Sequence, residues 1–178
     1  MTHRRLGAAV VWFTGLSGSG KSSIAAWVAA ELRGRGQPVE MLDGDVIRRI
    51  FPDTGFSRAE RDAHVRRAGY FASRLESHGV TVIASFVSPD RESRDAVRRL
   101  CRHFVEIHVA TPLEECERRD TKGLYARARR GDIRDFAGIN DAYEPPIAPE
   151  LVVDTSQISV EDAGRRVLDV LSDLTARP

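Results

Sequence analysis

The sequence predicts an α/β fold in which a doubly wound, mainly parallel sheet carries helices on both faces. Apolar runs suited to buried strands recur along the chain, and amphipathic helical segments separate them. The first run leads directly into a glycine-rich loop at residues 15–22, and a helix-forming segment follows it. A chain of 178 residues can bury one core but is too short for two full catalytic domains. We therefore expect one domain spanning residues 1–178.

The expected strands are short and rich in β-branched and apolar residues. In chain order they are VVWF at 10–13, VEML at 39–42, VTVIAS at 80–85, FVEIHV at 104–109 and LVVD at 151–154. The expected helices lie between or after them, at 21–33 with its run SIAAWVAA, 58–78, 91–99, 113–119 and 160–174. Ligands of such a sheet gather at the carboxyl ends of its strands.

The segment at residues 120–150 breaks this alternation. It is rich in Gly, Pro, Arg and Asp and has little apolar periodicity. It is too long for an ordinary connection and too aromatic for a plain linker. We interpret it as a lid over the site.

Composition limits the classes of partner. The chain carries 27 Lys and Arg against 26 Asp and Glu, a net charge of +1, which gives no sign of a nucleic-acid-binding surface. No stretch is long enough to span a membrane, and the apolar run near the N-terminus is interpreted as the first strand rather than a signal peptide. Cys101 and Cys116 lack metal-ligand or redox spacing, which favours a reduced, cytoplasmic setting.

The loop at residues 15–22 has the complete Walker A pattern, in the strand-loop-helix order that phosphate binding requires. Its glycines let backbone N–H groups turn onto phosphate oxygens, and the next helix directs its partly positive N-terminus at the same anion. Lys21 is expected to reach the β- and γ-phosphates, and the Ser22 hydroxyl to bind Mg²⁺. The pattern predicts a P-loop NTPase fold. The expected nucleotide-binding residues are Gly15, Leu16, Ser17, Gly18, Ser19, Gly20, Lys21, Ser22 and Ser23.

Two carboxylates, Asp43 and Asp45, follow the second expected strand and flank a glycine. One can meet Mg²⁺ through water, while the other can accept a hydrogen bond from an attacking hydroxyl. Alternatively, Asp-Gly-Asp is an ordinary turn with a helix N-cap. The Walker loop one strand away favours the catalytic interpretation.

From about residue 11 to residue 155 the sequence resembles the adenylylsulfate (APS) kinase family. The Walker loop alone is shared by many NTPases, whereas the segments Lys-Gly-Leu-Tyr and Phe-Val-Ser-Pro in this family's order are close to diagnostic. The matching residues are 15–22, Asp43-Gly44-Asp45 with Arg48, Gly55-Phe56-Ser57 with Arg61, Arg66 and Arg67, Phe86-Val87-Ser88-Pro89 with Arg91 and Arg94, Arg119-Asp120 with Lys122-Gly123-Leu124-Tyr125, and Phe136-Ala137-Gly138-Ile139 with Tyr143 and Glu144.

Such enzymes transfer the γ-phosphoryl group of MgATP to the 3′-hydroxyl of adenosine 5′-phosphosulfate, giving 3′-phosphoadenosine 5′-phosphosulfate and ADP. The resemblance implies that Arg48 and Arg61 hold the anionic phosphosulfate end, for which a guanidinium is well shaped. It implies that Phe56 and Phe136 sandwich the substrate adenine, although a phenylalanine such as Phe56, taken alone, is more often a core residue. Lys122 is expected to contact substrate or phosphate once the lid closes. The full acceptor-binding set is Asp45, Arg48, Phe56, Arg61, His64, Val87, Ser88, Lys122 and Phe136.

The predicted catalytic residues are Lys21, Asp43, Asp45, Ser88 and Arg119. The serine that matches Ser88 in this family has been assigned as a phosphoserine intermediate. No evident base lies beside it in sequence, and phosphoryl transfer needs in-line positioning more than a covalent relay. We favour direct transfer, with Ser88 as a hydrogen-bonding residue near the substrate and the phosphoenzyme as the alternative. Arg119 opens the lid segment and is the candidate that supplies charge to the transferring phosphoryl.

His64 stands where the family usually has Asn. It lies one helical turn after Arg61, so we expect the two side chains to share a face toward the substrate. If His64 contacts the acceptor, affinity should tighten as the imidazolium forms near the usual histidine pKa of about 6.5. The alternative is that His64 points into the helix packing and affects stability alone.

Two other function classes stay open beside the favoured one. His64 and Val46, which replaces the Asn that usually follows Asp-Gly-Asp, keep alive a related P-loop kinase acting on another nucleotide-linked acceptor. A nucleotide-dependent switch is less favoured, because the guanine-reading motif Asn-Lys-x-Asp is missing and a switch would not need acceptor-site arginines. A homodimer and a functional link to a separate ATP sulfurylase are partner hypotheses that the sequence leaves open.

Overall fold

The computed structural model describes residues 7–51, 55 and 57–176, and it contains a five-stranded parallel sheet. The strand order is β2-β3-β1-β4-β5, and each neighbouring pair is parallel. The strands are β1 (Val10–Thr14), β2 (Val39–Asp43), β3 (Thr81–Ser85), β4 (Phe104–Val109) and β5 (Leu151–Val153). The order confirms the doubly wound sheet and places all five carboxyl ends at one edge.

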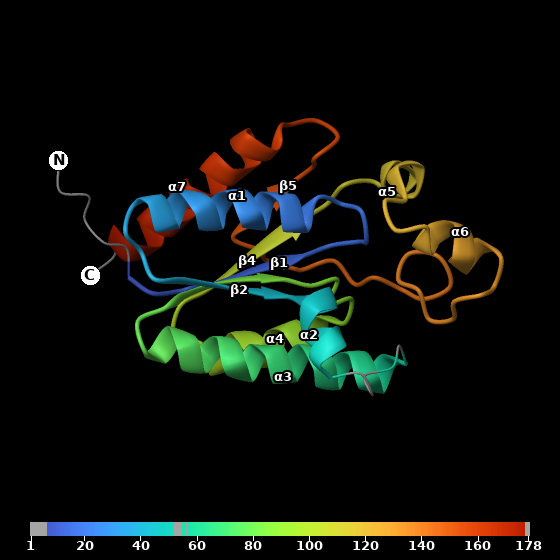
Figure 1. Ribbon diagram of the computed structural model, residues 1–178, viewed down its shortest axis with the longest axis horizontal. Coiled ribbons are helices and arrows are strands. Elements are labelled where there is room, and N and C mark those ends of the chain that lie inside the picture. The colour runs from blue at the N-terminus through green and yellow to red at the C-terminus, as the bar shows by residue number, and fades with distance from the viewer. Residues whose placement is uncertain (1–6, 52–54, 56, 177–178) are drawn as a thin grey trace.

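Helices cover both faces of the sheet (Figure 1). α1 (Lys21–Gly34) and α7 (Val160–Ala176) lie on one face, and α3 (Arg58–Ser77) and α4 (Arg91–Leu100) lie on the other. The short helix α2 (Gly44–Ile50) follows β2. Beyond the strand ends, α5 (Leu113–Arg119) and α6 (Leu124–Arg129) project from the body of the molecule, within and beside the predicted lid.

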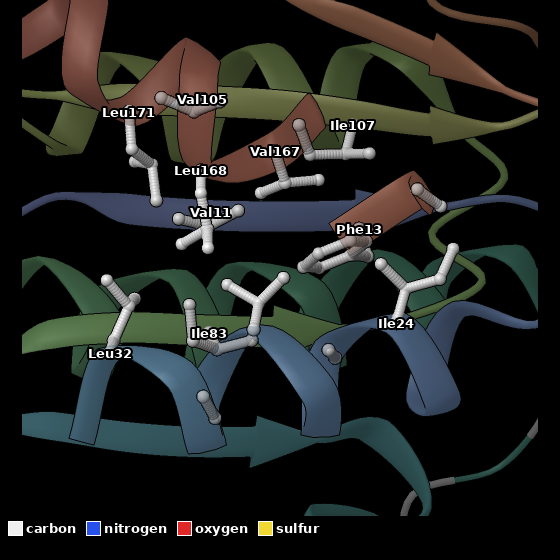
Figure 2. Close-up of a cluster of buried hydrophobic side chains, with 14 of the residues drawn as sticks. Val11, Phe13, Ile24, Leu32, Ile83, Val105, Ile107, Val167, Leu168 and Leu171 are labelled. Carbon is white, nitrogen blue, oxygen red and sulfur yellow. The ribbon is translucent and has the colours of Figure 1, made fainter. Parts of the chain in front are cut away.

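The central strand β1 explains why the core has two parts. Val11 and Phe13 pack with α1 and α7, where Ile24 and Leu32 join them in the cluster drawn in Figure 2. The alternate residue Trp12 packs with α3 and α4 on the opposite face. Because successive strand residues face opposite sides, a strand covered on both faces must be apolar throughout. All five residues of β1 are buried, so the start of the phosphate loop is anchored in the middle of the core.

Two helices differ from the sequence-based expectation. α2 follows the Asp-Gly-Asp motif, where no helix was among those expected, and α6 lies inside the segment interpreted as a lid. Both are short, and both begin beside a glycine, so their sequences carry little helical periodicity. Local capping defines α2 instead, as Asp43 accepts hydrogen bonds from the backbone N–H groups of its first turn.

Among the residues that the structure describes, no helix has the length and apolar character needed to cross a bilayer.

Candidate active site

A pocket of about 390 Å³ lies at the carboxyl ends of the strands. The phosphate loop forms one side of it, the ends of β2 and β3 with α2 and α3 form another, and lid residues between 121 and 137 line the rest. Ligand pockets for small molecules span roughly 300–1,000 Å³. The size and the mixed charged lining therefore suit a small anionic ligand.

Glycine backbone conformations and hydrogen bonds from two threonines fix the shape of the phosphate loop. Gly20 has φ of +99° at the start of α1, and a Cβ at Gly15 would lie 2.4 Å from the Val109 carbonyl oxygen. Only glycine fits these two conditions. Thr111 Oγ1 and Thr155 Oγ1 donate to the Ser19 carbonyl at 3.0 and 2.8 Å, which fixes the loop against β4 and β5.

Lys21 is the buried charge of this loop. Its Nζ donates to the Leu16 carbonyl at 2.6 Å, inside the loop itself, and the residue is only 7% exposed. Burial lowers the pKa of Lys21 from 10.5 to about 8. An ammonium that has lost its hydration and faces a carbonyl will gain strongly from a phosphate placed beside it.

Oxygen atoms that suit Mg²⁺ converge next to Lys21. Ser22 Oγ lies 3.2 Å from Asp43 Oδ2 and 3.2 Å from Ser85 Oγ. Asp43 Oδ1 also accepts from the backbone N–H of Asp45 at 2.9 Å and of Val46 at 3.2 Å, which confirms the helix N-cap, while the catalytic role of the two carboxylates stays a prediction. A carboxylate and two hydroxyls form the hard oxygen donor set that Mg²⁺ prefers. These residues fit the ion expected with a nucleoside triphosphate.

Asp45 stands at the start of α2 and forms an ion pair with Lys122 of the lid. Both side chains are more than half exposed, so the pair adds little to stability in water. It does bring the lid lysine to one of the two carboxylates predicted to be catalytic.

Ser88 lies deep in the pocket wall and has an unusual backbone conformation. Its φ is +38°, in the left-handed region that non-glycine residues rarely adopt. The hydroxyl accepts from Trp12 Nε1 at 3.1 Å and donates to Thr14 Oγ1 at 3.0 Å, and the residue is 3% exposed. Both of these partners belong to β1, which ties the turn after β3 to the central strand.

The two arginines predicted to hold the phosphosulfate are occupied by protein groups. Arg48 Nη1 donates to the Gly55 carbonyl at 2.6 Å. Arg61 donates to the Asp135 carbonyl at 2.6 Å and pairs with the Asp141 carboxylate. Both arginines line the pocket. Arg61 therefore orders the lid loop around Phe136 in this state, a contact that the sequence did not indicate.

His64 faces the pocket from α3 and is 3% exposed. Its Nε2 lies 3.2 Å from the Gly44 carbonyl, and its ring packs 5.6 Å from that of Phe86. Among the residues that the structure describes, the buried Nδ1 has no hydrogen-bond partner. Burial, reinforced by Arg48, lowers the pKa of His64 below 6.5. The pKa of about 6.5 expected for His64 is therefore corrected to a lower pKa, because burial disfavours the charged imidazolium.

Arg119 ends α5 and points back under the phosphate loop. Its Nη1 donates to Thr155 Oγ1 at 2.7 Å and to the Gly18 carbonyl at 3.3 Å, and its Nε pairs with Glu115. The guanidinium thus lines the pocket at the loop rather than standing in the lid.

Comparison with known proteins assigns this arrangement to a family. The family model for adenylylsulphate kinase matches residues 7–154. The adenylyl-sulfate kinase of Synechococcus sp. strain JA-3-3Ab is 51% identical over 153 residues, which are 85% of this chain and 87% of that protein. The chain belongs to the adenylylsulfate kinase family.

Solved structures agree with this family. The APS kinase of Mycobacterium tuberculosis in complex with AMPPNP and APS is 40% identical with a TM-score of 0.89, and the match covers 94% of this chain and 99% of that one. A hexameric APS kinase from Thiobacillus denitrificans is 34% identical with a TM-score of 0.73, covering 95% of this chain and 29% of that one.

The pocket brings together most of the residues predicted from the adenylylsulfate kinase pattern. Gly15, Leu16 and Ser19 lie outside its lining, where Ser19 is buried as part of the loop's support. Phe56 lies outside the described residues. The predicted residues that line the pocket are Ser17, Gly18, Gly20, Lys21, Ser22, Ser23, Asp43, Asp45, Arg48, Arg61, His64, Val87, Ser88, Arg119, Lys122 and Phe136.

Three residues that support this adenylylsulfate kinase site were given no role from the sequence. Ser85 brings its hydroxyl to Ser22, and its place as the last residue of an expected strand was an available signal. Tyr125 donates from its hydroxyl to the Ser17 carbonyl at 2.8 Å and lies edge-on to Phe136. Thr155 meets the loop across 136 residues of sequence, a contact that no local pattern reveals.

Proposed function

We propose that this protein phosphorylates the 3′-hydroxyl of adenosine 5′-phosphosulfate with ATP, as an adenylylsulfate kinase. The observation that carries the proposal is one pocket lined on one side by the phosphate loop and on the other by residues of the family's acceptor-side pattern. A neighbour of this chain with a TM-score of 0.89 was solved with AMPPNP and APS. Both ligand types therefore have a precedent within this fold.

On the donor side, the loop amides and Lys21 bind the β- and γ-phosphates. Lys21 exchanges the Leu16 carbonyl for phosphate oxygens, and its positive charge stabilises the negative charge that moves to the leaving oxygen. Ser22, Asp43 and Ser85 would hold Mg²⁺ directly or through water. When bound, that ion neutralises phosphate charge and orients the γ-phosphoryl group.

On the acceptor side, Asp45 receives the proton of the attacking hydroxyl. The 3′-oxygen forms a bond to the γ-phosphorus, the bond from that phosphorus to the β–γ bridging oxygen breaks, and the proton passes to the Asp45 carboxylate. Lys122 of the lid pairs with Asp45, so the lid contacts the residue that receives the proton. In this mechanism ADP leaves with the electron pair of the broken bond.

Ser88 acts as a wall residue rather than a phosphate carrier. Its hydroxyl is engaged on both sides by Trp12 and Thr14, so a phosphoserine would have to break two buried hydrogen bonds. Direct in-line transfer needs no such rearrangement. Lid closure over the pocket would exclude water, whose attack would waste ATP.

Two partner hypotheses concern the assembled protein. We propose a homodimer, for which sedimentation velocity gives the test: a species near twice the 19.8 kDa chain supports it, and a single species at the chain mass refutes it. A functional link to a separate ATP sulfurylase follows from the chemistry, since APS must come from an enzyme that joins an adenylyl group to sulfate.

An acceptor panel tests the proposed activity. The protein is incubated with MgATP and, in separate reactions, with APS, AMP, adenosine and gluconate, and ADP formation is followed. We expect ADP release that depends on APS and is lost in Lys21→Ala, because that change removes the charge on the transferring phosphates. Release with another acceptor but not with APS would refute the assignment.

A further inference from the structure

Arg94 is a fully buried cation that the proposed reaction does not use. It lies in the first turns of α4 and is 1% exposed. Its guanidinium donates in three directions: Nη1 to the Ser88 carbonyl at 2.6 Å, Nη2 to the Glu144 carbonyl at 2.6 Å, and Nε to Glu106 Oε1 at 2.8 Å. Buried arginines need partners for each face of the guanidinium, and two of these partners are backbone groups in segments that line or flank the pocket.

The first of these segments is the turn after β3 that forms the acceptor wall. Val87 and Ser88 line the pocket, and Ser88 holds a backbone conformation that is unfavourable for a side chain with a Cβ. Such a conformation persists only where the surroundings impose it. The Arg94 bond to the Ser88 carbonyl acts directly on the strained residue.

The second segment is the end of the lid, at Tyr143 and Glu144. The Glu144 backbone N–H donates to the Pro89 carbonyl at 2.9 Å, and the Glu144 carboxylate accepts from the Arg91 backbone N–H at 2.9 Å. The Tyr143 hydroxyl lies 3.0 Å from Thr14 Oγ1, which also accepts a hydrogen bond from the Ser88 hydroxyl. The lid's C-terminal end and the acceptor wall therefore meet on the same set of groups.

We propose that Arg94 is a positioning residue that couples the acceptor wall to the anchored end of the lid. The proposal rests on the proposed function, because the wall is assigned to APS. Arg94 touches neither substrate; it fixes the Ser88 carbonyl relative to Glu144, so that the lid closes onto a wall already in its binding conformation. Preorganisation of this kind lowers the cost of ordering the site when the acceptor binds.

The charge of Arg94 is balanced by the carboxylate of Glu106, and a second arginine on that carboxylate provides a control variant. Glu106 is buried on β4 and is shared between Arg94 and Arg98. Arg98 pairs in addition with Glu150, is one third exposed, and contacts neither Ser88 nor Glu144. Arg98→Lys therefore perturbs the same carboxylate while leaving the junction intact.

The test compares Arg94→Lys with Arg98→Lys in steady-state kinetics and in binding of an ATP analogue. Lysine keeps the charge beside Glu106 but cannot donate in three fixed directions. For Arg94→Lys we expect the KM for APS to rise roughly tenfold, with the affinity for the ATP analogue unchanged, since one lost hydrogen-bonded contact is worth about one order of magnitude in binding. Arg98→Lys should leave both constants at wild-type values.

Equal KM values for APS in wild type and Arg94→Lys would overturn the proposal, as would equal losses of ATP and APS affinity. A purely structural role for Arg94 would lower the melting temperature without weakening APS binding more than binding of the ATP analogue. If Arg94→Lys does not fold, Tyr143→Phe replaces it: a selective rise in the KM for APS supports the coupling, and an unchanged KM contradicts it. A wild-type protein that does not phosphorylate APS refutes the proposed function instead, so the two failures are distinct.

Discussion

Lys21 is the residue whose proton should respond to nucleotide. In the free protein its pKa is about 8, lowered mainly by burial, whereas phosphate oxygens will raise it on binding. Above pH 8 the free protein therefore lacks part of this proton and the complex holds it, so binding takes up a proton and affinity falls as pH rises. The charged and titratable groups around Lys21 are Cys116, Lys122, Asp45 and Asp43.

Calorimetry near pH 8.5 tests this prediction. At about that pH, nucleotide binding is measured in two buffers of different ionisation enthalpy, and we expect net proton uptake of a fraction of a proton. Cys116 does not contribute to the measured proton uptake, because burial raises the pKa of its thiol and the thiol stays protonated. Identical enthalpies in both buffers would contradict the assignment of Lys21, and Lys21→Ala serves as the variant without the titrating group.

Asp45 and Ser88 separate the two chemical mechanisms. Asp45→Asn should lower turnover by on the order of a hundredfold, since it removes the proton acceptor.

Ser88→Ala should keep most of the turnover and lose stability instead, by about 1–3 kcal/mol, because Trp12 Nε1 is left buried without its acceptor. Rates and melting curves are measured for both variants. An inactive Ser88→Ala protein, together with label from [γ-³²P]ATP trapped on Ser88 without acceptor, would establish the phosphoenzyme.

His64 should make the protein sensitive to acid. Burial holds its folded-state pKa below 6.5, so as pH falls the unfolded chain binds the proton first and folding stability is lost below about pH 6.5. His64→Asn has no such group, and its amide can still donate to the Gly44 carbonyl. We expect the melting temperature of wild type to fall faster than that of His64→Asn between neutral and mildly acid pH. Parallel melting curves would show that His64 carries no such linkage.

At the scale of elements, the lid divides into two parts. Residues 143–150 are tied to the body, for example by Arg98 with Glu150 and by Arg91 with the Pro145 carbonyl. The earlier part meets the body through Tyr125 at Ser17, Lys122 at Asp45 and Arg61 at Asp141. We therefore place the moving part of the predicted lid at residues 120–142. This segment is shorter than the lid at 120–150 predicted from the sequence.

Limited trypsin digestion tests lid gating. We expect the first cuts after Arg127, Arg129 or Arg130, and protection of these sites by ADP with APS, because closure orders the segment. The exposed bond after Arg35, at the end of α1, is the internal control and should be cut equally with and without ligands. Equal cleavage of the lid sites in both conditions would argue against a ligand-gated lid.

Regular elements were predictable where packing imposes a period. The sequence placed β1 at 10–13 against the observed Val10–Thr14, and the expected helix at 58–78 against Arg58–Ser77, because buried strands and long helices repeat their apolar residues. α2 escaped prediction because the Asp-Gly-Asp turn and its helix share one residue, Asp43, as cap. A seven-residue helix has too few turns to establish a period.

For the whole molecule, the sequence indicated which residues meet but not how each is held. The Walker loop, Asp45 and Ser88 share a pocket because strand order brings their elements to one sheet edge. The partners of Arg61 were beyond reach, since Asp141 lies 80 positions away in a segment without periodicity. Long-range ion pairs depend on tertiary packing, which composition and spacing do not encode locally.

The position of the transferred phosphate on the product decides whether the protein is a 3′-kinase of APS. Wild-type protein is incubated with MgATP and APS, and the product is analysed by ³¹P NMR and by digestion with a 3′-specific nucleotidase. We expect one new phosphomonoester on the 3′-oxygen, with the phosphosulfate bond intact and one ADP formed for each product molecule. A phosphate on the 2′-oxygen, cleavage of the phosphosulfate, or ADP formed without any phosphorylated nucleotide would contradict it.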